Sequence, residues 1–380
     1  MYPSIEKLRA IGFDQHALQA FHISQQLAHT SHIQRDLVMD QHALQAFHLA
    51  QSEQSTKPLQ LARISNIQRD HVLLHDGEAE SPARLRPALH HHLHASGETL
   101  AVGDWVLFSP QDDAWVETIL PARNRLCRRN AEGQRQALVA NIDLALLVMG
   151  LDHDFNLRRL DRYLTLCLSN EVIPLLVLTK ADCSPQVAEK MAQARAHLPA
   201  HIELLALDGR GDLAREALLP WLAAGQTVVL LGSSGAGKST LTNTLISAQV
   251  QDTGAVRLDD SRGRHTTTSR SLHLCPNGAC IIDTPGLRTI SLDSDEAGIH
   301  AAFADIAALA EHCRFRDCQH RDEPDCAVRD QISSDRLKSF HKLLRELGRE
   351  SQTPLQKQAQ LAVWKIRSKS ARAQRKNQID

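Results

Sequence analysis

The chain has 380 residues, of which 42% are hydrophobic and only 4% aromatic, and its formal net charge is −1. This length suggests two or three domains with aliphatic cores, and the near-zero charge means that any surface for a polyanion must be local. We find no apolar run of membrane-spanning length and no secretory signal, so we expect a cytoplasmic protein without a membrane partner. Eight cysteines in a reducing compartment are better explained as metal ligands or core residues than as a disulfide scaffold.

The N-terminal part of the chain contains an imperfect repeat. Residues 14–22 (DQHALQAFH) recur at 40–48, and residues 31–36 return in similar form at 65–70. Two copies are too few for a solenoid. We therefore interpret residues 1–56 as a duplicated helical or flexible arm without an activity of its own, and its histidines as surface or packing residues.

Residues 57–122 contain short, alternating apolar runs separated by turn signals such as Asp76-Gly77 and Gly103-Asp104. Short strands at this close spacing predict a small β-barrel, for which the OB-fold is a good candidate. The histidine-rich run 90–94 falls in its middle. Zinc binding is one interpretation of that run, but we favour a solvated loop because no Cys or carboxylate stands nearby.

Residues 123–292 alternate between apolar strands and helices, which predicts a parallel, doubly wound α/β domain. The expected strands are 144–149, 174–178, 202–207, 227–231 and 279–282, and the expected helices are 157–168 and 238–246. From 293 to 350 the pattern is helical and polar, and 351–380 form a basic tail. The predicted fold is thus multidomain, with a β-barrel, an α/β domain and a C-terminal helical domain.

A phosphate-binding loop follows the strand expected at 227–231. It matches the P-loop pattern with Gly232, Ser233, Ser234, Gly235, Ala236, Gly237, Lys238 and Ser239. In such a loop consecutive backbone N–H groups surround the β-phosphate, and the next helix points its positive end inward. We expect Lys238 to contact the β- and γ-phosphates, Ser239 to ligate Mg²⁺, and Thr240 to line the same site.

Two further segments are expected beside the γ-phosphate. Asp283-Thr284-Pro285-Gly286 follows an apolar strand, so Asp283 can hold Mg²⁺ through water and the Gly286 N–H can sense the γ-phosphate. The second segment, residues 263–268, lies between the P-loop and that strand. Within it Thr266 or Thr267 is expected to complete the Mg²⁺ shell, with a Thr-rich edge strand as the alternative.

The segment Thr179-Lys180-Ala181-Asp182 is a candidate for reading guanine. The Asp182 carboxylate can accept from guanine N1–H and the 2-amino group, a donor pair that adenine lacks, and the Lys180 stem can pack along the base. Thr179 stands where asparagine is usual, and we expect weaker hydrogen bonds between loops as a result. Ala206, in the loop 206–209, could supply a backbone N–H to guanine O6, although the usual Ser before Ala is missing.

The order of these motifs is inverted relative to an ordinary GTPase, because the base-reading segment precedes the P-loop. This order indicates a circularly permuted GTPase that binds GTP or GDP with Mg²⁺. Many GTPases place a Gln just after D-x-x-G to orient the attacking water, but Leu287 occupies that position here. We hypothesise that His265 orients the water instead, the alternative being a loop histidine without a catalytic role.

Four residues near the C-terminus, Cys313, Cys318, His320 and Cys326, form a C-x4-C-x-H-x5-C cluster. Three thiolates and one imidazole suit tetrahedral Zn²⁺ in a closed structural site. We therefore predict one architectural zinc ion, with reduced cysteines as the alternative and His312 as a substitute ligand. The remaining cysteines are interpreted as core or neutral positions.

Taken in their joint order, the motifs closely resemble the RsgA family of circularly permuted GTPases, over residues 59–347. This resemblance is carried by the P-loop, the base-reading segment, the two segments expected beside the γ-phosphate and the Cys/His cluster. It is carried further by the segments GDWV at 103–106, ANID at 140–143 and FNL at 155–157. The resemblance implies an OB-fold barrel, a permuted GTPase domain and a zinc-containing helical domain. The duplicated N-terminal arm and Thr179 depart from the family pattern.

The resemblance also implies what the protein does. Family members act late in maturation of the small (30S) ribosomal subunit, bind its 16S-type rRNA and are stimulated by the subunit, and the family also lacks the usual Gln, which supports His265. We expect such a GTPase, acting as a monomer, with hydrolysis coupled to release from the subunit. The alternative is a non-catalytic, GTP-liganded RNA-binding assembly factor.

Overall fold

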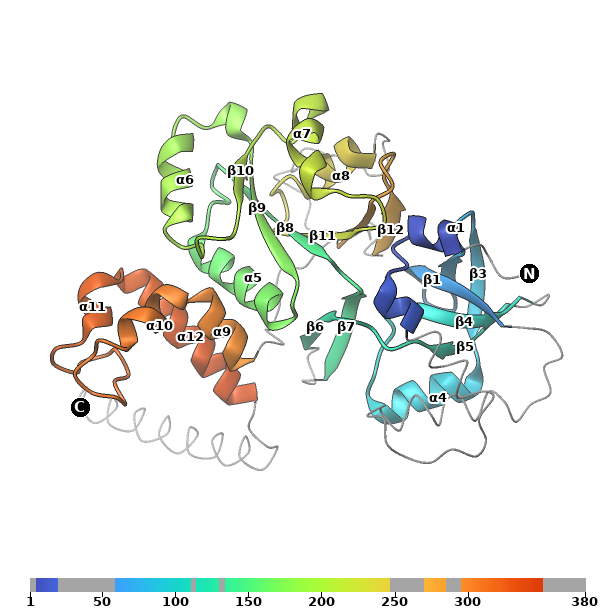
Figure 1. The fold of residues 1–380 in the computed structure, drawn as a ribbon, viewed down its shortest axis with the longest axis horizontal. Helices are drawn as coiled ribbons and strands as arrows, with labels where there is room; N and C mark the ends of the chain where they lie inside the picture. Colours follow the sequence, from blue (N-terminus) through green and yellow to red (C-terminus); the bar gives the residue numbers. More distant parts are fainter. Residues whose placement is uncertain are drawn as a thin grey trace, which may run out of the picture. The chain divides into compact units, whose positions relative to one another are not determined.

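The computed structural model describes residues 5–19, 59–110, 114–129, 134–246, 270–284 and 295–350. The chain divides into two compact units, Met1–Asp293 and Ser294–Asp380. Figure 1 labels most of the helices and strands of both. Within the described ranges, none of the helices combines the length and the apolar character that crossing a membrane requires.

The first unit contains a closed five-stranded barrel (Figure 1). Its strands are β1 (Gln60–Ile67), β2 (Val72–His75), β3 (Glu80–Leu85), β4 (Trp105–Ser109) and β5 (Trp115–Ile119). The neighbours run β1-β2-β3-β5-β4, and the pairing of β1 with β4 closes the ring. Buried side chains such as Ile64, Val106 and Val116 fill its interior. The barrel and its strand order confirm the predicted OB-fold.

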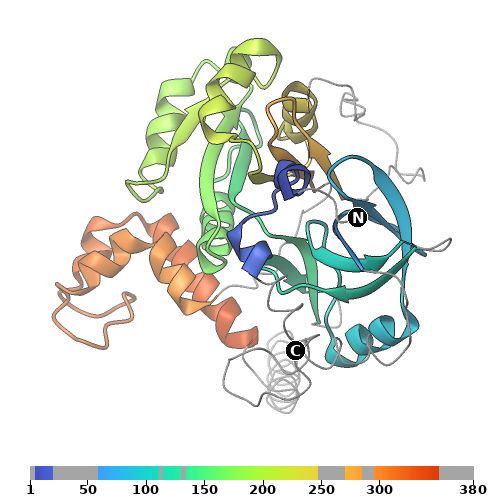
Figure 2. The same cartoon turned by 45° about the vertical axis from the view of Figure 1, so that its right-hand side comes forward.

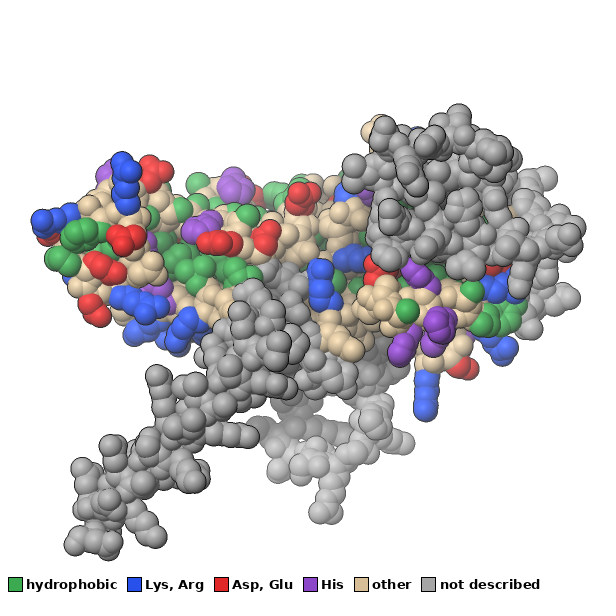
Figure 3. All heavy atoms as spheres, turned by 90° about the horizontal axis from the view of Figure 1, so that it is seen from below, with side chains coloured by type: hydrophobic (Ala, Val, Ile, Leu, Met, Phe, Trp, Pro, Cys, Tyr) green, Lys and Arg blue, Asp and Glu red, His purple; other side chains and the backbone are tan. Residues whose placement is uncertain are grey.

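The histidine-rich run lies in a helix, α4 (Pro87–Ser96), so the prediction of a solvated loop there is wrong. Pro87 opens this helix, and Gly97, with a φ of 71°, closes it in the left-handed conformation that favours glycine. Leu89 and Leu93 lie one turn apart and are buried against the barrel. The histidines consequently gather on the outer surface over this helix (Figure 3).

Beyond the barrel the same sheet continues in the order β10-β9-β8-β11-β13-β12. These strands are β8 (Leu144–Gly150), β9 (Ile173–Thr179), β10 (Leu204–Ala206), β11 (Thr227–Leu231), β12 (Ser271–Leu274) and β13 (Cys280–Asp283). Strands β10, β9, β8, β11 and β13 are parallel, and β12 is antiparallel to β13. A separate two-stranded ribbon, β6 (Arg125–Arg129) and β7 (Arg135–Ala140), lies between the barrel and this α/β domain in the sequence.

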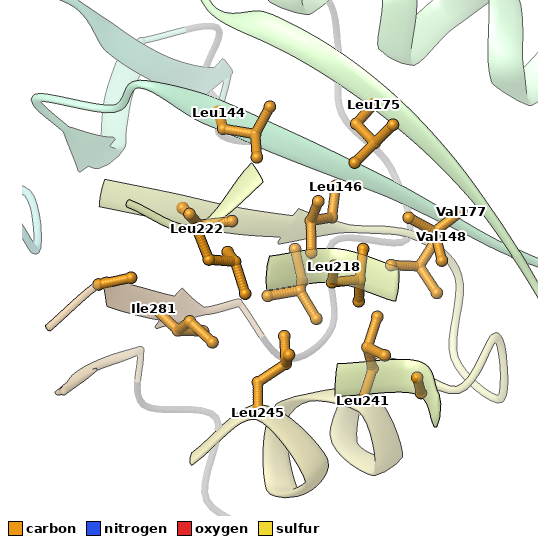
Figure 4. Close-up of a cluster of buried hydrophobic side chains, with 14 of the residues drawn as sticks. Leu144, Leu146, Val148, Leu175, Val177, Leu218, Leu222, Leu241, Leu245 and Ile281 are labelled. Atoms are coloured by element: carbon orange, nitrogen blue, oxygen red, sulfur yellow. The ribbon is translucent and has the colours of Figure 1, made fainter. Parts of the chain in front are cut away.

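Helices cover the parallel strands, which is why β8 and β11 are buried at every position. The helices are α5 (Leu157–Ser169), α6 (Val187–Arg195), α7 (Gly211–Leu218) and α8 (Lys238–Ile246), with short 3₁₀ turns at Ala181–Cys183 and Leu219–Trp221. Figure 4 shows Leu146 and Val148 of β8 in one buried cluster with Leu241 and Leu245 of α8. This packing fixes α8, and with it the loop that precedes α8, against the sheet.

The N-terminal segment is part of the folded unit over its first described residues. Helix α1 (Ile5–Ala10) and the residues after it lie beside the barrel and the α/β sheet (Figure 2). Ile11 is fully buried, and the Phe13 ring meets the edge of Trp105 at a centroid distance of 5.0 Å. Asp14 forms an ion pair with Arg123 at 3.0 Å. The second copy of the repeat, at 40–48, lies outside the described residues.

Arg63 of β1 connects three parts of this unit from a fully buried position. Its guanidinium donates to the carbonyl oxygens of Gly103 and Asn141, both at 3.1 Å, and to that of Ile11. It also lies over the Trp105 ring, 5.4 Å from the centroid. Burial lowers the pKa of Arg63. The barrel, the N-terminal segment and the loop before β8 thus share one buried cation.

The second unit is helical. It comprises α9 (Glu296–Ala302), α10 (Ala304–Ala310), α11 (Ala327–Gln331) and α12 (Ser334–Glu350). The rings of Phe303 and Phe340 pack with a distance of 5.3 Å between their centroids. Arg336 of α12 lies 4.6 Å above the Phe303 ring and binds both carboxylate oxygens of Asp305, at 2.6 and 2.8 Å. This contact attaches the long helix to the short ones.

Replacement of the buried guanidinium should destabilise the first unit. We expect Arg63→Met to lower the free energy of unfolding by about 3 kcal/mol, because the Ile11 and Asn141 carbonyl groups lose their Arg63 donor and that of Gly103 is left with its bond from Asn141 Nδ2. Urea unfolding followed by tryptophan fluorescence would measure the loss. The exposed Arg69 offers a matched control, Arg69→Met, for which we expect almost no change. Equal unfolding midpoints for the two variants would contradict the role assigned to Arg63.

Candidate nucleotide-binding site

The two loops expected to hold a nucleotide lie at the same edge of the sheet. Strand β8 pairs in parallel with β9 on one side and with β11 on the other. The carboxyl ends of all three strands therefore face the same way, which is where ligands bind in open α/β sheets. The base-reading segment follows β9 and the P-loop follows β11.

The P-loop has the backbone that its glycines allow. Gly235 and Gly237 have φ angles of 82° and 96°, which side chains rarely permit. A side chain at Gly232 would collide with the carbonyl oxygen of Val148 on β8. The loop is therefore a cradle of backbone N–H groups at the start of α8, and this geometry suits a phosphate group.

Lys238 and the two residues after it form the first turn of α8. The Lys238 side chain is buried, and its Nζ donates to the carbonyl oxygens of Gly232 (2.9 Å) and Ser233 (2.7 Å). The ammonium group therefore points into the loop, where the β- and γ-phosphates are expected. Ser239 and Thr240 are half-buried beside it.

The base-reading segment is joined directly to the P-loop. The Thr179 hydroxyl donates to the carbonyl oxygen of Ala236 at 2.6 Å, and this bond is buried. Thr179 therefore keeps a hydrogen bond between the loops from the end of β9, and the expectation that it is weaker than that of asparagine stays a prediction. Lys180, with a left-handed φ of 60°, donates from Nζ to the carbonyl oxygen of Gly235 at 2.7 Å. Two adjacent residues thus hold the segment after β9 against the P-loop.

Two carboxylates after β8 support these loops, and the sequence analysis did not identify them. Asp152 accepts from Lys180 at 2.8 Å, and although burial raises the pKa of Asp152, this hydrogen bond makes the net shift downward. Asp154 accepts from the Ser233 hydroxyl of the P-loop and from the backbone N–H of Gly150 at 3.0 Å. The available signal was an acidic pair directly after a buried strand.

Asp182, the predicted guanine selector, is partly exposed beside the loop that follows β10. Arg210 donates to its Oδ2 at 2.7 Å, and the Cys183 thiol contacts the same oxygen at 3.1 Å. The hydrogen bond from Cys183 and the charge of Arg210 hold the pKa of Asp182 below its ordinary value. Ala206 ends β10 in register with Leu178, at the same edge of the sheet. Sequence reasoning did not find Arg210.

Asp283 lies on the phosphate side. It ends β13, which is parallel to β11, and its side chain is buried. The next residue, Thr284, donates its hydroxyl to the carbonyl oxygen of Leu230 at 2.7 Å and so holds the end of β13 against the P-loop strand. His265, Thr266, Thr267, Gly286 and Leu287 lie outside the described residues. Their assignments remain predictions.

Comparison with known proteins identifies the family. The family model for the RsgA GTPase matches residues 119–293. The small ribosomal subunit biogenesis GTPase RsgA 2 of Vibrio vulnificus is 40% identical over 302 residues, which cover 78% of this chain and 86% of the relative. The chain belongs to the RsgA family. The RsgA protein of Xylella fastidiosa (strain M23) is 47% identical over 258 residues, covering 66% of this chain and 76% of that protein.

As a member of this family the protein is a GTPase, an enzyme that hydrolyses GTP. Two solved structures share its fold. YjeQ from Thermotoga maritima aligns with a TM-score of 0.55 at 23% identity, covering 76% of this chain and 99% of that chain. YloQ, described as a circularly permuted GTPase, aligns at 0.52 with 22% identity, covering 79% and 99%. The predicted permuted architecture is therefore confirmed.

The Cys/His cluster assembles in the second unit. The ligand atoms of Cys313, Cys318, His320 and Cys326 all lie within 4.8 Å of one another. His320 Nδ1 is 3.7 Å from the Cys313 sulfur and 3.5 Å from that of Cys326. Around a tetrahedral zinc ion with bonds near 2.3 Å, neighbouring ligand atoms stand about 3.8 Å apart. The donor set and its spacing therefore fit zinc.

The backbone around this cluster is shaped for convergence of the ligands. His320 and Asp325 both adopt a left-handed φ of 56°, which is uncommon for residues other than glycine. The Cys326 sulfur also accepts from the Arg329 backbone N–H at 3.4 Å, at the start of α11. His312, the substitute ligand considered from the sequence, is exposed and is not part of the cluster.

The buried hydroxyl between the loops should contribute to nucleotide affinity. We expect Thr179→Val to weaken GTP binding about five- to tenfold, because the buried Ala236 carbonyl loses its donor at a cost of about 1–1.5 kcal/mol. Thr179→Ser keeps the hydroxyl and should bind nearly as the parent does. Titration with a fluorescent GTP analogue would measure both. If the valine variant binds as tightly as the serine variant, the contact does not position the loops.

Loss of one cluster residue should remove the metal and unfold the second unit. We expect Cys318→Ser to abolish stoichiometric zinc, measured by elemental analysis of the purified chain, because three ligands hold zinc much more weakly than four. The loss of short helices should follow in the circular dichroism spectrum. Cys183→Ser, outside the cluster, should retain one zinc ion per chain. Full zinc content in the Cys318 variant would overturn the assignment.

Proposed function

We propose that this GTPase acts in late maturation of the small ribosomal subunit in the cytoplasm, where it binds the subunit and its 16S-type rRNA and couples GTP hydrolysis to release. The observation that carries the proposal is the joined pair of loops at the sheet edge, in a chain of the RsgA family. Relatives at 40–47% identity bear the name small ribosomal subunit biogenesis GTPase. Leu287 slightly favours the non-catalytic alternative, but membership of the GTPase family argues against it.

Within the site each loop has a separate task. The cradle at 232–239 binds the β-phosphate, with Lys238 directed at the β- and γ-phosphates. Asp182 reads the guanine edge, and Thr179 with Lys180 keeps the base loop at a fixed distance from the cradle. Water attacks the γ-phosphorus, the bond to the bridging oxygen breaks, and GDP and phosphate leave. The P-loop residues stabilise the negative charge of this transition state.

Magnesium is expected to accompany GTP. Ser239 of the first α8 turn and the buried Asp283 at the end of β13 lie at the same edge, and their oxygens suit this hard cation. When bound, Mg²⁺ neutralises charge on the β- and γ-phosphates. We further propose Thr266 or Thr267 as its switch ligand and the Gly286 N–H as the γ-phosphate sensor.

His265 is our proposal for the residue that orients the attacking water. Leu287 stands at the position where many GTPases carry glutamine, and an aliphatic side chain cannot orient water. His265 directly precedes the two threonines proposed for Mg²⁺. The absence of the usual glutamine leads us to expect slow hydrolysis without the subunit.

Binding of rRNA is assigned to the barrel and to the Cys/His module. An OB-fold offers a surface for irregular or single-stranded RNA. Exposed arginines interleave with the cluster ligands, namely Arg314, Arg316, Arg321 and Arg329. Contacts of such residues with phosphates should weaken as salt rises. The basic tail 351–380, a further candidate, lies outside the described residues.

The proposal predicts that purified small subunits raise the rate of GTP hydrolysis at least tenfold, and that ATP hydrolysis stays at background. Phosphate release with and without subunits is the measurement. Lys238→Ala should abolish the stimulated rate because the γ-phosphate loses its cation. His265→Ala should bind subunits normally yet lose most of the stimulation.

Each outcome separates a different part of the proposal. Tight GTP binding without any stimulation by small subunits would reject the subunit-dependent cycle. If large ribosomal subunits stimulate GTP hydrolysis as strongly as small ones, the small subunit is not the specific partner. Unchanged stimulated turnover and subunit affinity in the His265 variant would reject only the role of that histidine.

A further inference from the structure

The carboxylate that reads guanine must be held at one rotation angle. Bidentate recognition requires both Asp182 oxygens to lie in the plane of the base, but the terminal torsion of an aspartate is broad and weakly restricted. One third of the Asp182 side chain is exposed, so packing alone does not fix this torsion. In the described part of the chain its side-chain partners are Arg210 and the weak thiol donor Cys183.

Arg210 is itself held from two sides. Its Nη2 donates to Asp182 Oδ2 at 2.7 Å, while its Nε donates to Asp208 Oδ1 at 2.9 Å. A planar guanidinium that bridges two carboxylates has a defined orientation. The neighbouring Gly209 carbonyl accepts from the Thr244 hydroxyl of α8 at 2.9 Å. The loop of Arg210 is thereby connected to the helix that begins at the P-loop.

The Arg210 contact leaves room for a base. Oδ2 has two lone pairs, which here accept from Arg210 and from the weak Cys183 thiol donor. A guanine N–H can displace the thiol while Arg210 stays in place, and Oδ1 remains for the second guanine donor. The chain also lacks the Ser that usually precedes Ala in the loop after β10, and Arg210 supplies a donor from that same loop. An ion pair this exposed contributes little to stability by itself, which favours a geometric role.

We propose that Arg210 is a positioning residue for guanine recognition, which sets the rotation of the Asp182 carboxylate from the loop after β10. The inference rests on the proposed assignment of 179–182 as the base-reading segment. Its signature is a loss of discrimination between bases that differ in one donor. Inosine nucleotides are the suitable probe, because they retain N1–H and lack the 2-amino group.

The test measures the affinities of GTP and ITP for Arg210→Ala in the full chain. We expect GTP affinity to fall about five- to tenfold and the preference of GTP over ITP to fall by a similar factor, because a rotating carboxylate loses the second bond. Arg210→Lys keeps the charge but cannot bridge both carboxylates. Its GTP affinity and its preference of GTP over ITP should lie between those of the parent and of Arg210→Ala. Lys338→Ala, which removes an exposed ion pair with Asp335 on α12 in the second unit, is the control and should leave both affinities unchanged.

Two results would overturn the proposal. An unchanged preference of GTP over ITP in Arg210→Ala would show that the carboxylate needs no such support. Tighter GTP binding would show that Arg210 blocks the site instead of shaping it. Asp182→Asn separates these from failure of the base-site assignment, because unchanged preference of GTP over ATP in that variant rejects the assignment whatever Arg210 does.

Discussion

The parallel pairing of β8 with both β9 and β11 is the constraint on which the nucleotide site depends. It places the ends of two strands that are far apart in the sequence on either side of a third, at one edge of the sheet. Because strand pairing depends on position in space, it does not depend on which of the two loops comes first along the chain. The inverted order of motifs therefore leaves the site intact, and Thr179 still reaches the Ala236 carbonyl.

Strand pairing alone does not set the spacing between the base and phosphate sites. Short polar contacts do this, and they come from all three loops at the edge. Lys180 connects Asp152 after β8 with the Gly235 carbonyl of the P-loop, while Asp154 holds the Ser233 hydroxyl. The contacts of Asp152 and Asp154 are partly buried, where hydrogen bonds are stronger than in water, whereas the bond from Lys180 to Gly235 is exposed. Among the described residues, the three loops at this edge are therefore joined to one another by the protein's own contacts.

The barrel belongs to the same unit as the site because of buried polar contacts as well as apolar ones. Arg63 cannot be buried without donors and acceptors in place, since an isolated buried charge is very costly. Its three acceptors come from the barrel, from the loop before β8 and from the N-terminal segment. These parts consequently have to assemble together. In the second unit the buried Arg336 is likewise paired, here with Asp305. The neighbouring helices have five to seven residues and are too short to be stable alone.

The sequence by itself determined the class of the protein, because its signals are local. Glycine spacing, a lysine at a helix start and a Cys/His pattern each predict chemistry within a few residues, and their order predicted the permuted fold. The same local signals predicted a loop at 90–94, where the structure has a helix. That helix forms because the barrel gives Leu89 and Leu93 an apolar surface to pack against.

Tertiary structure alone decided the contacts between distant segments. Neither Asp154 nor Arg210 belongs to a recognisable motif. Asp154 acquires its role from Ser233, 79 residues away in the sequence, and Arg210 from Asp182 in a neighbouring loop. Ile11 and Phe13, which directly precede the first copy of the repeat, attach this part of the chain to the fold by their buried side chains. Local patterns specify which chemistry a loop can perform. The sheet specifies which loops meet, because strand pairing and burial depend on residues far apart in the chain.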